Sequence, residues 1–245
     1  MATMNFSANT CAPKGGTVRM TAQNKNSNGT TDPMQIRAYS IGEEIANAVT
    51  HGLGVAAAIV GLTLMLNKGI PVLPASGIAA ISVYGATLIL MFLCSTLYHS
   101  IQHEPAKAVL KRLDHCAIYL LIAGSYTPLM LIALDNSASH LLLAFIWVLA
   151  AMGVLFKALF VHRFKKLAMV TYLAMGWASL AVIVELYAVL PTAGFILLLA
   201  GGLSYSLGTL FYAAKRFPYT HAIWHLFVLG GAVCHCLTIA LYVIP

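Results

Sequence analysis

The sequence predicts an all-α membrane protein, a bundle of seven membrane-spanning helices. Of the 245 residues, 60% are hydrophobic and only 9% are charged, whereas a soluble domain carries roughly 25% charged residues. The apolar residues also form runs of ~20 separated by short polar breaks, which is the length that a helix needs to cross a bilayer. Composition therefore excludes a soluble globular domain, a mainly disordered chain, a fibrous chain and a secreted disulfide scaffold.

The polar segment 1–38 is rich in Asn, Thr, Ser, Gly and Lys and contains hardly any aliphatic residue. It has no continuous apolar stretch of the kind found in a secretory signal peptide. A segment of this composition cannot bury enough surface to order itself. We expect residues 1–38 to form a flexible cytosolic tail and residues 39–245 to form the transmembrane domain.

Seven segments are long and apolar enough to span a membrane, and polar or helix-breaking residues separate them. The segments are at about 47–66, 75–98, 113–134, 141–161, 167–187, 192–212 and 219–243. The breaks are 67–71, 99–112, 135–140, 162–166, the region of Pro191, and 215–218. Every break is too short to contain an inserted soluble domain, so we expect short loops.

Lysine and arginine residues predict the orientation of these spans. With seven spans, the N-terminal segment and the second, fourth and sixth loops lie on one side and hold all but one of the 14 Lys and Arg; the exception is Lys68. The positive-inside rule places that side in the cytoplasm, so the C-terminus lies outside. We therefore read the net charge of +7 as a signal for insertion into the cell's inner (plasma) membrane rather than for nucleic-acid binding.

Polar residues within spans are costly and are candidates for function. The second span ends in Ser95-Thr-Leu-Tyr-His99, and the seventh begins with His221-Ala-Ile-Trp-His225. Spacing of i, i+4 on a helix places two side chains on one face, and two such imidazoles can bind one metal ion. The predicted orientation brings His99, His221 and His225 to the cytoplasmic end, where Asp114 opens the third span. We expect these groups to lie at one depth.

This set of residue types is typical of a zinc site. Three neutral imidazoles leave a fourth coordination position for water, whose pKa falls toward ~7 on zinc. Asp114 can orient an imidazole or accept a proton as general base, and Ser95 can hydrogen-bond to the water, the carboxylate or a tetrahedral intermediate. The alternatives are histidines that simply lie in the interface and an Asp114 that pairs with Arg112 or Lys111.

For the other ionisable residues we expect supporting or structural roles. His51, near the inner end of the first span, either supports a metal-binding imidazole or packs between helices. The tripeptide Cys234-His235-Cys236 resembles a ligand set, but adjacent residues on a helix point apart, which favours packing. Glu43 and Glu44 are expected to cap the first helix or to attract lysines beneath the bundle.

Several motifs together resemble the bacterial hemolysin III proteins, which belong with the progestin and adiponectin receptor family. The motifs are Gly42–His51, Ser95–His99, Leu113–Pro128, Tyr172–Trp177 and His221–Gly231. The resemblance covers residues ~40–245 and implies a seven-helix bundle with its N-terminus inside. It also implies that His99, His221 and His225 bind one Zn²⁺ per chain, with Asp114 and Ser95 beside it. Kinship with alkaline ceramidases implies a lipid-amide hydrolase, and the bacterial members suggest a role in membrane-lipid or fluidity homeostasis.

Three functions follow as hypotheses. The first is an intramembrane zinc hydrolase, with Asp114 and Ser95 as catalytic residues and a membrane lipid as substrate. The second is a sensor of membrane state in which zinc joins two spans, and the third is a pore-forming hemolysin. We prefer the first, and we leave open whether the protein forms homo-oligomers.

Overall fold

The structure, a computed structural model, describes residues 39–161, 163–214 and 217–245. These residues form helices joined by short connections, and no strand occurs among them. Seven helical segments are long and apolar enough to cross a membrane. The predicted all-α, seven-span fold is therefore confirmed, whereas the predicted tail at 1–38 lies outside the described residues.

The seven spans are built from eight α-helices and three short irregular helical segments. In chain order the elements are α1 (Ile41–Gly69), α2 (Ala75–Ser100), α3 (Glu104–Pro128), the π-helical η1 (Leu129–Leu134), α4 (Ser137–Phe160), α5 (Lys165–Gly176), the 3-10 segment η2 (Trp177–Val182), α6 (Ile183–Val189), α7 (Thr192–Ala213), α8 (Thr220–Thr238) and the π-helical η3 (Ile239–Val243).

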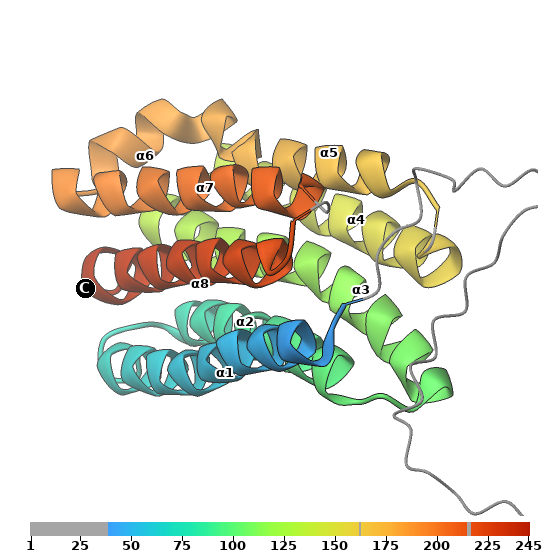
Figure 1. Ribbon diagram of the computed structural model, residues 1–245. Helices are drawn as coiled ribbons and strands as arrows, with labels where there is room; N and C mark the ends of the chain where they lie inside the picture. Colours follow the sequence, from blue (N-terminus) through green and yellow to red (C-terminus); the bar gives the residue numbers. More distant parts are fainter. Residues whose placement is uncertain (1–38, 162, 215–216) are drawn as a thin grey trace, which may run out of the picture. The chain divides into compact units, whose positions relative to one another are not determined.

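The helices run roughly side by side, and α8 lies between α1 and α7 (Figure 1). Helix α2 packs against both α1 and α3, and α3 packs against α4. The most apolar windows of α2 and α3 are each 56% buried, whereas those of α4, α5–α6 and α7 are only 17% buried. The centre of the bundle is thus formed by α2 and α3. The spans formed by α4, by α5–α6 and by α7 present most of their surface outward.

Helix α1 begins at Ile41 because a capping box fixes its first turn. The Ser40 hydroxyl accepts a hydrogen bond from the Glu43 backbone N–H (3.2 Å), and a Glu43 carboxylate oxygen accepts one from the Ser40 N–H (2.8 Å). These two bonds satisfy donors that a helix start leaves free. The capping role expected of Glu43 is confirmed, and the helix starts earlier than the apolar run at 47–66 indicates.

Helix α3 corrects the predicted polar break at 99–112. It begins at Glu104, inside that break, with Pro105 in its first turn. Proline is favoured there because the first N–H groups of a helix have no intrahelical partner. Hydropathy alone could not reveal this start, because the first turns of α3 are polar. The basic residues of the break therefore lie on a helix, which positions Lys107 for the site described below.

The fifth span is interrupted, although the sequence predicts one helix over 167–187. Its middle is the 3-10 segment Trp177–Val182. The Tyr126 hydroxyl of α3 donates to the carbonyl oxygens of Met175 (2.8 Å) and Gly176 (2.9 Å), and it accepts from the Ser179 N–H (2.7 Å). A side chain that inserts into the backbone ladder in this way breaks the regular helix.

Candidate metal centre

Three histidine side chains converge at one end of the bundle. His99 comes from the last turn of α2, and His221 and His225 come from the first two turns of α8. One ring nitrogen from each imidazole can be chosen so that all three lie within 4.8 Å of one another. The i, i+4 pair and the end of α2 thus meet as the sequence predicts, and the group can hold a metal ion.

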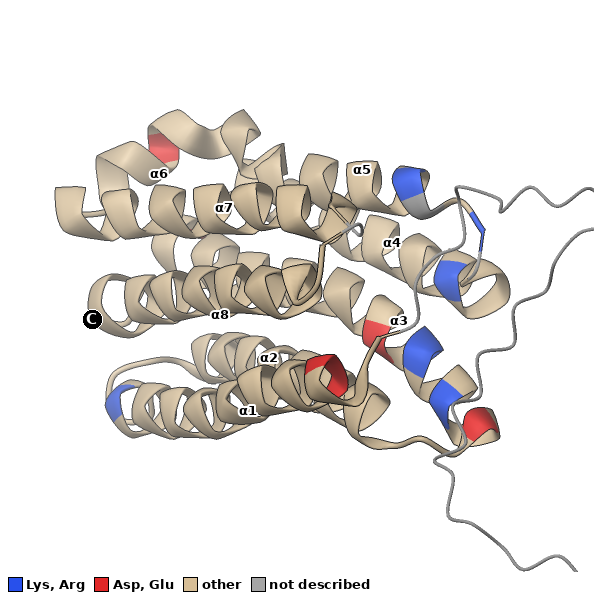
Figure 2. Cartoon of the chain, viewed as in Figure 1, with Lys and Arg blue, Asp and Glu red and all other residues tan. Residues whose placement is uncertain are grey.

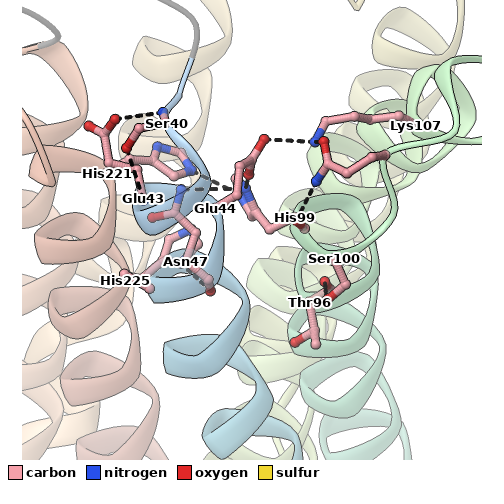
Figure 3. A network of polar contacts seen from close by, with 12 residues as sticks. Ser40, Glu43, Glu44, Asn47, Thr96, His99, Ser100, Lys107, His221 and His225 are labelled. Atoms are coloured by element: carbon pink, nitrogen blue, oxygen red, sulfur yellow. Dashed lines mark hydrogen bonds and ion pairs between the residues drawn. The ribbon is translucent and has the colours of Figure 1, made fainter. Parts of the chain in front are cut away.

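The ring of His99 is held by Glu44 of α1 (Figure 3). The Nδ1 atom of His99 lies 2.6 Å from Glu44 Oε2 and 3.4 Å from the Asn47 side-chain amide. The carboxylate can only accept, and its contact is much the shorter, so Nδ1 donates to Glu44. The lone pair on Nε2 of His99 is therefore left facing Nε2 of His221, 3.2 Å away.

The ring of His225 is held in the same sense by the backbone of α1. Its Nδ1 lies 3.1 Å from the Asn47 carbonyl oxygen and 3.2 Å from the Thr50 hydroxyl, which donates its own proton to Ala46. Both neighbours accept, so Nδ1 carries the proton. Nε2 of His225 is buried and has no hydrogen-bond partner, and its lone pair is available to an ion.

The buried polar atoms that lack a partner are concentrated here. Among the described residues, they are Asn47 Oδ1, both ring nitrogens of His51, Ser95 Oγ and His225 Nε2. An unsatisfied polar group costs several kcal/mol in a membrane interior, so their gathering in one place indicates a site for a polar or charged group.

The spacing of the nitrogens fits a tetrahedral cation. The Nε2 atoms of His99 and His221 lie 3.2 Å apart, close enough for both to contact one cation. With Zn–N bonds of ~2.0–2.1 Å and tetrahedral angles, two ligand nitrogens are about 3.3 Å apart. The His99–His221 pair matches that spacing, and the set of three is somewhat wider. The three histidines fit zinc in type and spacing, and His99 and His225 also fit it in tautomer.

Asp114 and Ser95 lie close to this histidine group. Asp114 is buried on α3, and its carboxylate acts electrostatically on His99 and Ser95. The Ser95 hydroxyl is buried and makes no hydrogen bond of standard geometry among the described residues. Asp114 Oδ2 also lies 3.5 Å from His115 Nδ1. A buried carboxylate and a buried hydroxyl beside three imidazoles provide a base and a donor at one place.

His51 contacts the group through its ring face. Its ring stacks on that of His225 with 3.5 Å between centroids and an interplanar angle of 11°. His51 therefore lies directly behind a candidate ligand, but it supports this ligand by stacking and makes no hydrogen bond to it.

The ring of Tyr39 packs against two of the histidines, His99 and His221. Its ring centroid lies 5.1 Å from that of His221 and 6.0 Å from that of His99. Partial burial raises the pKa of the Tyr39 hydroxyl, which therefore stays neutral as it covers the group.

Sequence reasoning named His51 of α1 as a possible support for a ligand, but it missed the contacts that Glu44 and Asn47 make to the histidines. Glu44, Asn47 and His51 share one face of α1, at spacings of three and four residues, and all contact the histidine group. That spacing is a signal, but it required knowing that this face of α1 turns toward α2 and α8. Lys107 completes the arrangement by donating to Glu44 Oε1 at 2.7 Å, as expected for a lysine attracted to this glutamate.

Comparisons with known proteins show the family to which the chain belongs. Residues 39–236 match the family described as haemolysin-III related. The chain is 45% identical over 215 residues to Hemolysin-3 of Bacillus cereus, covering 88% of this chain and 98% of that protein. It is 44% identical over 204 residues to the Hemolysin-3 homolog of Bacillus subtilis (strain 168), covering 83% and 96%. It is 34% identical over 209 residues to the human monocyte to macrophage differentiation factor, covering 82% and 84%. The resemblance read from the motifs is thereby confirmed: the chain is a multi-pass membrane protein that belongs to the haemolysin-III-related family.

Proposed function

We propose that this protein is a zinc-containing hydrolase of the cell's inner membrane that cleaves an amide or ester bond in a membrane lipid. One observation carries the proposal: unsatisfied buried polar atoms gather around three imidazoles whose ring nitrogens come within 4.8 Å of one another. A buried carboxylate and hydroxyl adjoin them, which is the donor set that hydrolysis by a metal ion requires.

In this proposal the three histidines bind the ion, and residues of α1 orient the histidine rings. His99, His221 and His225 are the three ligands in this proposal. When bound, zinc supplies a Lewis acid that polarises a carbonyl group and makes water more acidic. Glu44 fixes the tautomer of His99 by accepting its Nδ1–H, and the Asn47 carbonyl does the same for His225.

The remaining polar groups would handle protons and charge. Asp114 accepts a proton from the attacking water and returns it to the leaving amine or alcohol. The Ser95 hydroxyl donates a hydrogen bond to the oxygen on which negative charge develops. Burial of both residues excludes bulk water, which strengthens these interactions.

The proposed orientation places this site at the cytoplasmic end of the bundle. The start of α1, the end of α2 and the start of α8 meet at the site. Among the described residues, the basic positions on α3, at the end of α4 and at the start of α5 belong to the same end (Figure 2), and the positive-inside rule assigns that end to the cytoplasm.

An Asp114→Asn variant tests the catalytic proposal. Asparagine has nearly the same shape but cannot act as a base, so we expect hydrolysis to fall by about 10²- to 10⁴-fold while the bound metal is retained. The measurement is product release from ceramide and from phospholipid esters by purified protein in nanodiscs, with metal content measured in parallel. Asp135→Asn, at an exposed carboxylate at the opposite end of α3–η1, is the matched control. Full hydrolysis by Asp114→Asn would remove Asp114 from the mechanism.

A sensor of membrane state is the second candidate, because the histidine group joins α2 to α8 and contacts α1. In that case the metal is structural. Asp114→Asn would be silent in cells, whereas alanine at any of the three histidines would impair the response to a change of lipid composition. This pattern, without hydrolysis by the wild type, would replace the hydrolase proposal.

The name of the bacterial relatives raises a third function, lysis by pore formation. A chain with seven spans of its own should remain in the membrane of the cell that makes it. We expect purified protein added to red cells to cause no lysis, and lysis under those conditions would revive the pore hypothesis.

A further inference from the structure

A groove lies between α3, α4 and α5, with a volume of about 460 Å³. Its floor includes the ring of Tyr119, which lies against the backbone of α4 at Gly153. A Cβ atom at Gly153 would come within 2.4 Å of that ring, so the floor depends on the absence of a side chain there. The volume is in the range of small-molecule sites, roughly 300–1,000 Å³.

The groove is long, narrow and apolar. It follows α4 from Phe145 to Phe156, and the fifth span from Leu167 in α5 to Ala178 in η2. Along α4 this is about 16 Å at a rise of 1.5 Å per residue. The hydrocarbon core of a bilayer is ~30 Å thick, so the groove has the length of one leaflet. The hydroxyls of Tyr119 and Thr171 bond to each other at 2.7 Å, so these polar groups in the lining already have a partner.

One end of the groove is basic. No acidic residue occurs from residue 136 to residue 184, whereas this stretch contains Lys157, Arg163, Lys165 and Lys166. Arg163 and Lys166 are exposed. Both lie in the stretch between Phe156 and Leu167, the lining residues at that end of the groove. Figure 2 shows basic positions at the end of α4 and the start of α5, and no acidic position on either helix.

We propose that this groove binds one acyl chain of an anionic phospholipid, whose headgroup phosphate pairs with Arg163 and Lys166. The apolar length of the groove fits a chain from one leaflet, and the basic end lies where the headgroup of that leaflet would be. The site involves none of the candidate metal ligands, and the proposal is independent of hydrolysis.

Native mass spectrometry of full-length, delipidated protein tests the proposal. The probes are phosphatidylglycerol and phosphatidylcholine with identical acyl chains. We expect preferential retention of phosphatidylglycerol by the wild type. Each of Arg163→Gln and Lys166→Gln should reduce that preference roughly fivefold, since a basic residue near a membrane surface contributes ~1 kcal/mol to binding anionic lipid. Arg112→Gln, at an exposed arginine on α3, should leave it unchanged.

A second pair of variants tests the groove itself. Ala174 lines it from α5, so Ala174→Trp should fill it and abolish retention of both lipids. Ala151→Trp, on an exposed position of α4 outside the lining, is the control for bulk. Ala178→Phe fills the same groove from another position if Ala174→Trp does not fold.

Three results would overturn the proposal. Equal retention of the two lipids would show that binding does not depend on the charge of the lipid headgroup. Phosphatidylglycerol that remains bound when the groove is filled would place the lipid on the surface instead. A dimer that Ala174→Trp dissociates would identify the occupant as a second copy of the chain.

Discussion

Helix α8 carries histidines near both of its ends, and the two ends differ in what the ring nitrogens meet. At the first end, His221 and His225 converge with His99 of α2, and Nε2 of His225 has no hydrogen-bond partner in the part of the chain that the structure describes. Near the other end, Nε2 of His235 lies 3.3 Å from the Leu198 carbonyl oxygen, to which it donates. The ring of His235 also packs edge-on against Tyr205.

The difference shows that neighbouring helices, rather than the residue type, decide what a buried histidine can do. Cys234 and Cys236 flank His235 and suggest a ligand set in the sequence, but the only metal-like group of three among the described residues is the one at the first end. The packing expected for His235 therefore agrees with the structure. A metal site needs free lone pairs that converge from more than one helix.

Paired alanine substitutions on α8 should give the largest contrast. His225→Ala removes a proposed ligand, and we expect zinc affinity to fall by more than the ~10- to 100-fold typical of losing a residue behind a ligand. His235→Ala should leave zinc affinity unchanged and cost about 1–3 kcal/mol of stability, because it removes a buried hydrogen bond to the Leu198 carbonyl and the ring that packs against Tyr205. Competition with a chelator and thermal unfolding measure the two effects. Equal loss of zinc in both variants would abolish the distinction between the two ends.

The adjacent glutamates of α1 offer a finer comparison. Glu44→Gln removes the charge that holds Nδ1 of His99, so zinc affinity should fall about 10- to 100-fold. Glu43→Gln preserves the capping box, in which glutamine is also accepted, and should change affinity little. The same chelator competition applies, and a Glu44→Gln protein with wild-type affinity would show that this contact does not support the ligand.

His51→Phe should have the smallest effect. Phenylalanine keeps a flat ring against His225 and makes no hydrogen bond, as His51 makes none among the described residues. We expect zinc affinity within about threefold of the wild type, well below the effect of losing a hydrogen-bonded support. A loss of tenfold or more would mean that the ring nitrogens of His51 act on the site, as the alternative reading of the sequence has it.

The sequence predicted the number of spans and the meeting of His99, His221, His225 and Asp114 at one end of the bundle, because helical period and span length are local signals. It did not predict that Glu44 holds His99, because that contact depends on the rotation of α1 against α2. The early start of α3 and the interruption of the fifth span were missed for related reasons. A polar first turn does not stand out in hydropathy, and Tyr126 breaks a helix that is distant in sequence.

The metal content of detergent-purified protein tests the central claim most directly. Elemental analysis would compare the wild type with a His99/His221/His225 triple-alanine variant, both prepared without chelators and checked for folding. The account predicts one zinc per chain in the wild type and none in the triple variant. A folded wild-type protein without zinc, or a triple variant that retains it, would contradict the assignment of these histidines as a metal site.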